Sequence, residues 1–83
     1  MSTDGYFNEL ESRKRLGRNI RALRKFYGFS QAEFARLVRV KGNRHWLQRI
    51  ESGKSRLDAV DLPAIARVLR CTPEELVNYD LTQ

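Results

Sequence analysis

The stretch from Ser30 to Gly53 constrains the fold more than any other part of the chain, because it is patterned as two short helices joined by a turn. Ser30 with Glu33 three residues later forms a capping box, which marks a helix start. Gly42 and Asn43 interrupt the helical pattern, since glycine can end one helix in the left-handed conformation and asparagine can cap the next.

The second of these helices has an apolar stripe and a polar, basic remainder. Leu47 and Ile50 stand three residues apart, on the side expected to be buried. Its other faces carry Arg44, His45, Gln48 and Arg49 and no acid. A helix of this kind, held by a partner helix, suits the DNA major groove.

Charge is unevenly distributed along the chain. Residues 13–56 hold 14 of the 16 Lys and Arg residues and only two acids, a net charge of +12, whereas the remainder has a net charge of −6. A basic body between acidic ends favours a surface for a polyanion over a soluble surface that is merely uneven.

Composition excludes several classes of protein. With 83 residues, 41% of them hydrophobic, the chain makes one soluble globular domain. There is no membrane-spanning run and no signal peptide, so we expect a cytoplasmic protein. One Cys and one His cannot build a disulfide or a structural zinc site, so no metal or cofactor is expected. No catalytic residues are expected either, because no paired carboxylates, nucleophile–base set or glycine-rich phosphate loop is present.

Helical periodicity predicts an all-α chain with helices at about 13–27, 31–40, 44–52, 62–70 and 73–79. In the first helix Leu16, Ile20, Leu23 and Tyr27 form the apolar stripe, with Ser12 as cap and Gly28 at its end. The domain therefore spans 13–80. We expect residues 1–12 to be an arm or a short extra turn, and residues 81–83 to be a tail in a fraying stretch that begins at residue 80.

The fourth helix could be capped by Asp58 or by Asp61. Pro63 favours Asp61, because a proline costs little near the first turn but removes a backbone bond deeper in a helix. The start of the fifth helix is clearer, since Thr72 precedes Pro73 and two acids.

Residues 16–77 resemble the Cro/C1-type helix-turn-helix family, which includes the lambdoid phage repressors. The matching segments are LGRNIRALR from Leu16, GFSQAEFA from Gly28, LQRIESGK from Leu47, LPAIARVL from Leu62 and TPEELV from Thr72. The resemblance covers about three quarters of the chain. It implies a compact, five-helix, lambda-repressor-like domain that binds double-stranded DNA, usually as a homodimer, in a protein that is bacterial or phage-encoded.

The chain departs from the family pattern between Ala35 and Ile50, where it is two residues longer than usual. The common turn glycine falls at Arg39. Either the second helix is extended or the turn is longer. Alignment backward from Ile50 makes Asn43 the cap and treats Lys41 and Gly42 as the insertion.

The resemblance also implies residue roles. Base contacts would come from Asn43, Arg44, His45, Gln48 and Arg49. Phosphate contacts would come from Gln31, Lys41, Ser52, Lys54 and Arg56. Gln31 would also brace the recognition helix, and Arg24 and Glu51 would form an ion pair between the first and third helices.

Plainer interpretations stay open for some of these residues. Gln31 could be an exposed first-turn residue and His45 a solvated surface histidine. For Trp46 we favour partial core packing, with backbone contact to DNA as a second use. Tyr27, Phe29 and Phe34 are predicted core residues rather than stacking platforms.

The leading functional prediction is a sequence-specific transcriptional regulator, a repressor in its simplest form, acting as a homodimer on a near-palindromic operator. The acidic C-terminal part is the expected dimer surface, with Val77, Tyr79 and Leu81 as anchors. The alternative is an antitoxin-type module that binds a protein partner as well as DNA, through exposed apolar residues such as Tyr6, Phe7, Tyr79 and Leu81. RNA binding is disfavoured because no exposed aromatic platform is evident.

Overall fold

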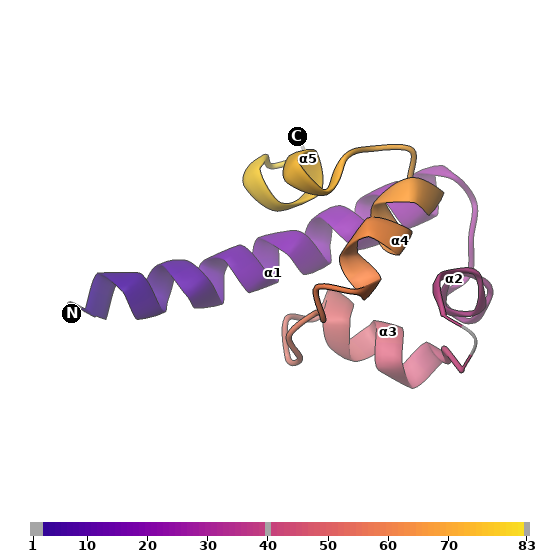
Figure 1. Cartoon of the computed structure of the whole chain (residues 1–83), viewed down its shortest axis with the longest axis horizontal. Helices are drawn as coiled ribbons and strands as arrows, with labels where there is room; N and C mark the ends of the chain where they lie inside the picture. Colours follow the sequence, from indigo (N-terminus) through magenta and orange to yellow (C-terminus); the bar gives the residue numbers. More distant parts are fainter. Residues whose placement is uncertain (1–2, 40, 83) are drawn as a thin grey trace.

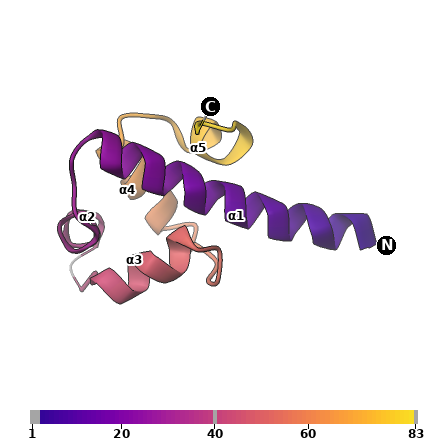
Figure 2. The same cartoon turned by 180° about the vertical axis from the view of Figure 1, so that it is seen from behind.

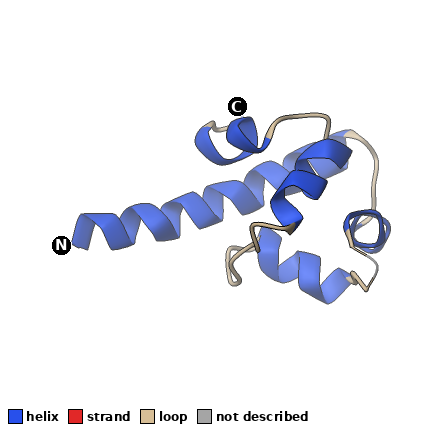
Figure 3. Ribbon diagram, in the orientation of Figure 1, coloured by secondary structure: helices blue, strands red, loops and turns tan. Residues whose placement is uncertain are grey.

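The computed structural model describes residues 3–39 and 41–82, which form helices and loops and no strand (Figure 3). The helices are α1 (Thr3–Phe26), α2 (Gln31–Val38), α3 (Arg44–Glu51), α4 (Asp61–Val68) and α5 (Pro73–Asn78). α3 and α5 pack on opposite sides of α1, and the N-terminal end of α1 projects beyond the rest of the molecule (Figures 1 and 2). The predicted all-α, five-helix fold is confirmed.

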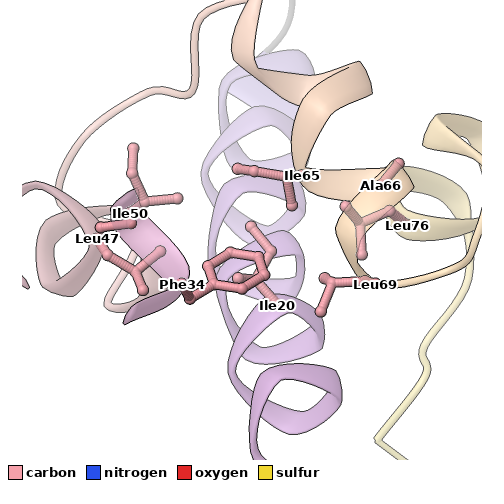
Figure 4. Packing of buried hydrophobic residues seen from close by; sticks show 9 residues of the cluster. Ile20, Phe34, Leu47, Ile50, Ile65, Ala66, Leu69 and Leu76 are labelled. Atoms are coloured by element: carbon pink, nitrogen blue, oxygen red, sulfur yellow. The ribbon is translucent and has the colours of Figure 1, made fainter. Parts of the chain in front are cut away.

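The core lies between the C-terminal half of α1 and the four shorter helices. It consists of Ile20, Phe34, Ala35, Leu47, Ile50, Ile65, Ala66, Leu69 and Leu76, all nearly or completely buried (Figure 4). Phe29 and Trp46 are partly buried against this cluster, as predicted. Tyr27 is not a core residue, because α1 ends one residue before it and the residue is 37% exposed.

Capping boxes explain where α2 and α5 begin. The Ser30 hydroxyl accepts the Glu33 N–H at 3.1 Å, and the Glu33 carboxylate accepts the Ser30 N–H at 3.0 Å, so the predicted capping box is present. These hydrogen bonds to Ser30 hold the pKa of the Glu33 carboxyl below its usual value. Thr72 and Glu75 form a second capping box at α5, with Pro73 at its first position.

α1 is longer than the predicted helix at 13–27. Residues 3–12, expected to be an arm or a short extra turn, belong to α1, and Ser12 lies inside the helix instead of capping it. The stretch from residue 9 to residue 15 contains no glycine or proline and mostly strong helix formers, so nothing there stops the helix. The C-terminal end agrees with the prediction, because Gly28 adopts a left-handed φ of 81°.

α4 starts one residue earlier than predicted, and Asp61 does not cap it. The N-cap position is Val60, which makes no side-chain hydrogen bond, while Asp61 is the first helical residue. The N–H groups of Asp61 and Leu62 instead donate to the Asp58 carbonyl, at 3.0 and 3.2 Å. Pro63 therefore stays within the first turn, where helix N–H groups lack an intrahelical partner in any case.

Asn19 fixes Tyr79 and Leu81 to α1, so the predicted fraying is wrong for residues 80 and 81, while residue 83 lies outside the described residues. Asn19 is completely buried and donates to the carbonyls of Leu76, at 2.8 Å, and Tyr79, at 2.7 Å. Its Oδ1 atom accepts the Leu81 N–H at 2.9 Å. One buried amide thus replaces the capping groups that the end of α5 lacks.

The connection between α2 and α3 is lengthened, which decides between the two ways of placing the extra residues. α2 ends at Val38 and not at residue 40, and α3 begins at Arg44. Gly42 does not have a positive φ, so it is not the left-handed helix end that the sequence suggested. It is needed for space, because a Cβ there would lie 2.1 Å from the Ala35 carbonyl oxygen.

Candidate nucleic-acid interface

α3 presents one continuous polar face to solvent. The Asn43 Oδ1 atom accepts the Trp46 N–H at 2.9 Å, so Asn43 is the N-cap that the sequence predicted. Leu47 and Ile50 anchor the opposite face in the core. The residues predicted to meet bases are all exposed: Asn43, Arg44, His45, Gln48 and Arg49. The single acid of α3, Glu51, is buried, so the exposed face carries only neutral and positive groups.

Two surface hollows adjoin this face and overlap at Gln48 and Ser52. One is lined by His45, Gln48, Arg49, Ser52 and Lys54, and the other by Arg21, Arg24, Gln31, Gln48, Glu51 and Ser52. Residues predicted to read bases and residues predicted to hold phosphates therefore lie on one surface. Arg21 was not among the predicted site residues, although it is one of the basic residues of α1.

The loop after α3 is tied to the recognition helix. The Arg49 Nε atom donates to the Ser55 hydroxyl at 3.1 Å, and the Ser52 hydroxyl donates to the Arg49 carbonyl at 3.2 Å. Gly53 has a left-handed φ of 79° and packs against Lys14 of α1. These contacts place Lys54, which is exposed, next to the end of α3.

The predicted phosphate-contacting residues are not all in one place. Gln31, Ser52 and Lys54 border the two hollows beside α3, and Lys41 is exposed in the turn before it. Arg56 instead lines a separate, mainly apolar groove with Leu16, Leu57, Leu62 and Val77.

A buried ionic network fixes α3 against α1 and α2. Arg24 donates to the Glu51 carboxylate from Nε at 2.7 Å and from a terminal nitrogen at 3.2 Å, which is the expected ion pair. Arg24 also donates to the Phe29 carbonyl at 2.8 Å. The Gln31 amide donates to Glu51 at 3.1 Å, so it contacts the recognition helix as a brace would. Both charged side chains are nearly buried, at 8% and 4% exposure.

A second network was not predicted, and it surrounds the lengthened turn. The Arg39 guanidinium lies over the Trp46 ring, 4.9 Å from its centroid. The same group lies 3.8 Å from the Asp61 carboxylate. Sequence spacing could not reveal these contacts, because they join residues from three different helices or their ends.

The predicted dimer residues differ in how available they are. Val77 is partly exposed in the apolar groove, and Tyr79 is 57% exposed. Leu81 packs against the core of its own chain, so it is not a free anchor.

Comparison with known proteins agrees with this geometry. A family model described as a helix-turn-helix domain matches residues 15–78. The chain belongs to this helix-turn-helix family. That assignment confirms the resemblance to Cro/C1-type proteins, and the chain is a DNA-binding regulator. No curated protein sequence matches the chain.

Two solved structures are similar to this helix-turn-helix chain. One is the restriction-modification controller protein C.AhdI from Aeromonas hydrophila, with 28% identity and a TM-score of 0.68; the match covers 76% of this chain and 92% of that one. The other is the clp gene regulator ClgR from Corynebacterium glutamicum, with 20% identity and a TM-score of 0.71, covering 78% of this chain and 67% of that one. The second likeness concerns the fold alone. Among the described residues, no helix has the length and apolarity that crossing a membrane requires.

Proposed function

We propose that this chain represses transcription by binding, as a homodimer, to a near-palindromic DNA operator that α3 reads in the major groove. The observation that carries the proposal is the exposed, acid-free face of α3, on which Asn43, Arg44, His45, Gln48 and Arg49 lie together. Arginine can bond two acceptors of guanine at once, and glutamine or asparagine can do the same with adenine. Repression follows physically when such a dimer occupies a promoter.

The residues around α3 supply the DNA contacts that do not depend on base sequence. We assign phosphate contacts to Gln31, Lys41, Ser52 and Lys54, which border α3 or the turn before it. Phosphate contacts orient a protein on the duplex without reading its sequence. Arg56 is left out of this group, because it lines the separate groove beside Val77 that is proposed to meet a second copy of the chain.

Selection of bound duplexes from a random pool, followed by binding measurements on substituted proteins, tests base recognition and phosphate contacts separately. Arg44→Ala or Arg49→Ala should each cost about 1–3 kcal/mol at the selected site and relax the base preference there. Lys54→Ala should weaken selected and random duplexes by the same factor. If the arginine variants leave the ratio of selected to random binding unchanged, α3 does not read the bases as proposed.

An antitoxin-type role remains the second candidate, because large apolar side chains outside α3 are exposed. Of the residues expected for this role, Tyr79 is exposed and Leu81 packs on its own core, while the side chains of Tyr6 and Phe7 lie outside the described part of the structure. Phe26 is 78% exposed, Leu37 55% and Val60 84%. A protein that masks a partner needs such a surface. Co-expression with the product of a neighbouring gene, and isolation of a stoichiometric complex whose formation Leu37→Glu or Phe26→Glu abolishes, would favour this role over simple repression.

A further inference from the structure

Arg39 connects three elements at the point where the helix-turn-helix departs from its usual length. It is the C-cap of α2, and its N–H donates to the Ala35 carbonyl at 3.1 Å. Its guanidinium carbon lies 4.9 Å from the centroid of the Trp46 ring, in the first turn of α3. Its Nη1 atom lies 3.8 Å from Asp61 Oδ2, at the first residue of α4.

Gly42 shapes the path that makes these contacts possible. Its N–H donates to the Arg39 carbonyl at 2.9 Å, so the chain turns back towards α2. A Cβ at position 42 would lie 2.9 Å from the Arg39 Cγ atom, as well as 2.1 Å from the Ala35 carbonyl oxygen. The stem of Arg39 therefore passes directly over the glycine on its way to Trp46.

The surroundings of Arg39 are only partly solvated. Its side chain is 41% exposed, but the Asp61 side chain is 13% exposed and Trp46 packs against the core. A guanidinium over an indole face is a favourable contact, and it strengthens as water is excluded. The carboxylate is farther away than a hydrogen-bonded partner would be, so it acts on Arg39 through its charge and not through a hydrogen bond.

We propose that Arg39 is a positioning residue for DNA recognition: its contacts with Trp46 and Asp61 fix the start of α3 relative to α2 and α4. Trp46 comes directly after Arg44 and His45, so a contact on its ring acts on the first turn of α3, next to two residues proposed to meet bases. Two-point hydrogen bonds to a base tolerate displacements of only about 0.5 Å, so the start of this helix must be held firmly. The proposal rests on sequence-specific DNA binding by α3.

A direct phosphate contact by Arg39 is the competing explanation, and it predicts a different effect of Arg39 substitution on DNA binding. Loss of a phosphate contact weakens selected and random DNA alike, and it reduces the slope of log affinity against log salt by roughly 0.9. Loss of a positioning contact lowers affinity for the selected sequence specifically and leaves the salt slope unchanged.

The first test compares Arg39→Ala with Arg36→Ala, which removes the same charge from the last turn of α2 without touching Trp46 or Asp61. The probes are the duplex selected by the unmodified protein and a random-sequence duplex of equal length, titrated at several salt concentrations well below each melting temperature. Arg39→Ala should lower the selected-to-random ratio about 3- to 30-fold, the range expected from a cation–π contact. Arg36→Ala should leave the ratio unchanged.

The second test substitutes the two residues that Arg39 contacts, Asp61 and Trp46. Asp61→Asn removes a negative charge, so electrostatics alone would tighten binding to all DNA, whereas the positioning role requires a lower selected-to-random ratio. Trp46→Phe keeps an aromatic face and should retain most of the ratio, whereas Trp46→Leu should lose it. Arg39→Ala should then add little in a Trp46→Leu background, because both substitutions remove the same contact.

Either of two results overturns the positioning role. One is an Arg39→Ala ratio equal to that of the unmodified protein, and the other is full additivity of the Arg39 and Trp46 substitutions. A selected-to-random ratio near one for the unmodified protein would instead overturn sequence-specific binding itself, so the two failures are distinguishable.

Discussion

Glu51 joins three helices through one carboxylate. It accepts two hydrogen bonds from Arg24 of α1 and one from Gln31 of α2, and only 4% of its side chain is exposed. A buried ion pair adds little stability over an apolar pair of similar volume, but removal of one partner leaves the other charge buried and uncompensated. The network therefore matters most as a fixed connection between α3 and the helices behind it.

Glu51→Gln should accordingly destabilise the fold while barely changing base preference. The loss is expected to be about 3–5 kcal/mol, because Arg24 would keep its charge in a site that is only 8% exposed. Urea denaturation measures the change in the free energy of unfolding, with Glu74→Gln, an exposed acid of α5, as the control. Equal unfolding midpoints for the two variants would show that the pair is not a structural element.

Arg70 adopts a conformation that suits glycine. Its φ is 58°, and the hydrogen bonds from Arg70 to Arg67 and from Cys71 to Ala66 close the end of α4 as glycine closes other helices. Its guanidinium also lies 5.8 Å from the Tyr27 ring centroid, a contact that any small residue would lose.

Comparison of two variants at this position isolates the backbone contribution. Arg70→Gly and Arg70→Ala both remove the Tyr27 contact, but only alanine keeps the left-handed strain of about 1–2 kcal/mol. The glycine variant should therefore be the more stable by roughly 1 kcal/mol in thermal denaturation, after its greater unfolded-state entropy is allowed for. This order reverses the usual preference for alanine in helices, and equal stabilities would exclude strain at Arg70.

At the scale of elements, the two glycines that follow α1 and α2 have different purposes. Gly28 has a φ of 81° and open space around its Cα, whereas Gly42 has an ordinary φ and no room for a Cβ. Arg39, which occupies the position of the usual turn glycine, has an extended φ of −146° and needs no glycine. The two additional residues replace a tight left-handed turn with a longer path closed by the Gly42–Arg39 hydrogen bond.

Gly42→Ala should destabilise the chain by overpacking, at a cost of about 1–3 kcal/mol, because the new Cβ would meet the backbone carbonyl of Ala35 and not a flexible side chain. The change in the free energy of unfolding should be accompanied by chemical-shift changes in α2 and the first turn of α3. Gly28→Ala, whose cost comes from φ alone, should leave α3 undisturbed and serves as the comparison. An α3 that shifts equally in both variants would contradict this account.

Local sequence signals predicted α2, α3 and α5 well, because a capping side chain precedes each of these helices. Ser30, Asn43 and Thr72 cap the helices that they were expected to cap. The α4 start was misplaced by one residue, because a backbone carbonyl, that of Asp58, replaces the side-chain cap. Every residue has a backbone carbonyl, so the residue type gives no sign of where a carbonyl takes the place of a side-chain cap.

Long-range polar contacts were predicted only where the family resemblance pointed to them. The pair of Arg24 with Glu51 was found in this way, and Asn19 and Arg39 were not. Asn19 follows Leu16 by three residues and precedes Leu23 by four, so it borders the apolar stripe of α1, but helical register alone does not show that its amide contacts α5. The base-contacting and phosphate-contacting roles stay predictions, since they concern a partner that the chain alone does not contain.

For the whole molecule, the distribution of charge and apolar surface suggests how two copies would meet. The basic body, which contains α3, would repel a second copy and is committed to DNA. The acidic C-terminal part borders a mainly apolar groove that contains Leu16, Leu57, Leu62 and Val77, and Arg13 and Arg56 of the basic body also line it, where they can meet acids of a second copy. Since Leu81 packs on its own core, Val77 and Tyr79 remain as candidate contacts for a second copy.

Two copies paired through this groove should bind one near-palindromic site. One recognition helix reads only a few base pairs, which is too little to select a site in a genome, so a second helix is needed about 34 Å away, with half-site centres about 10 base pairs apart. A small interface would make the free protein a weak dimer that tightens on DNA.

Footprinting and sedimentation should show two protomers on one symmetric site. Val77→Glu should reduce this to half-site binding, whereas Leu37→Glu, on the outer surface of α2, should not. Saturation of an asymmetric site by a single protomer would contradict the dimer.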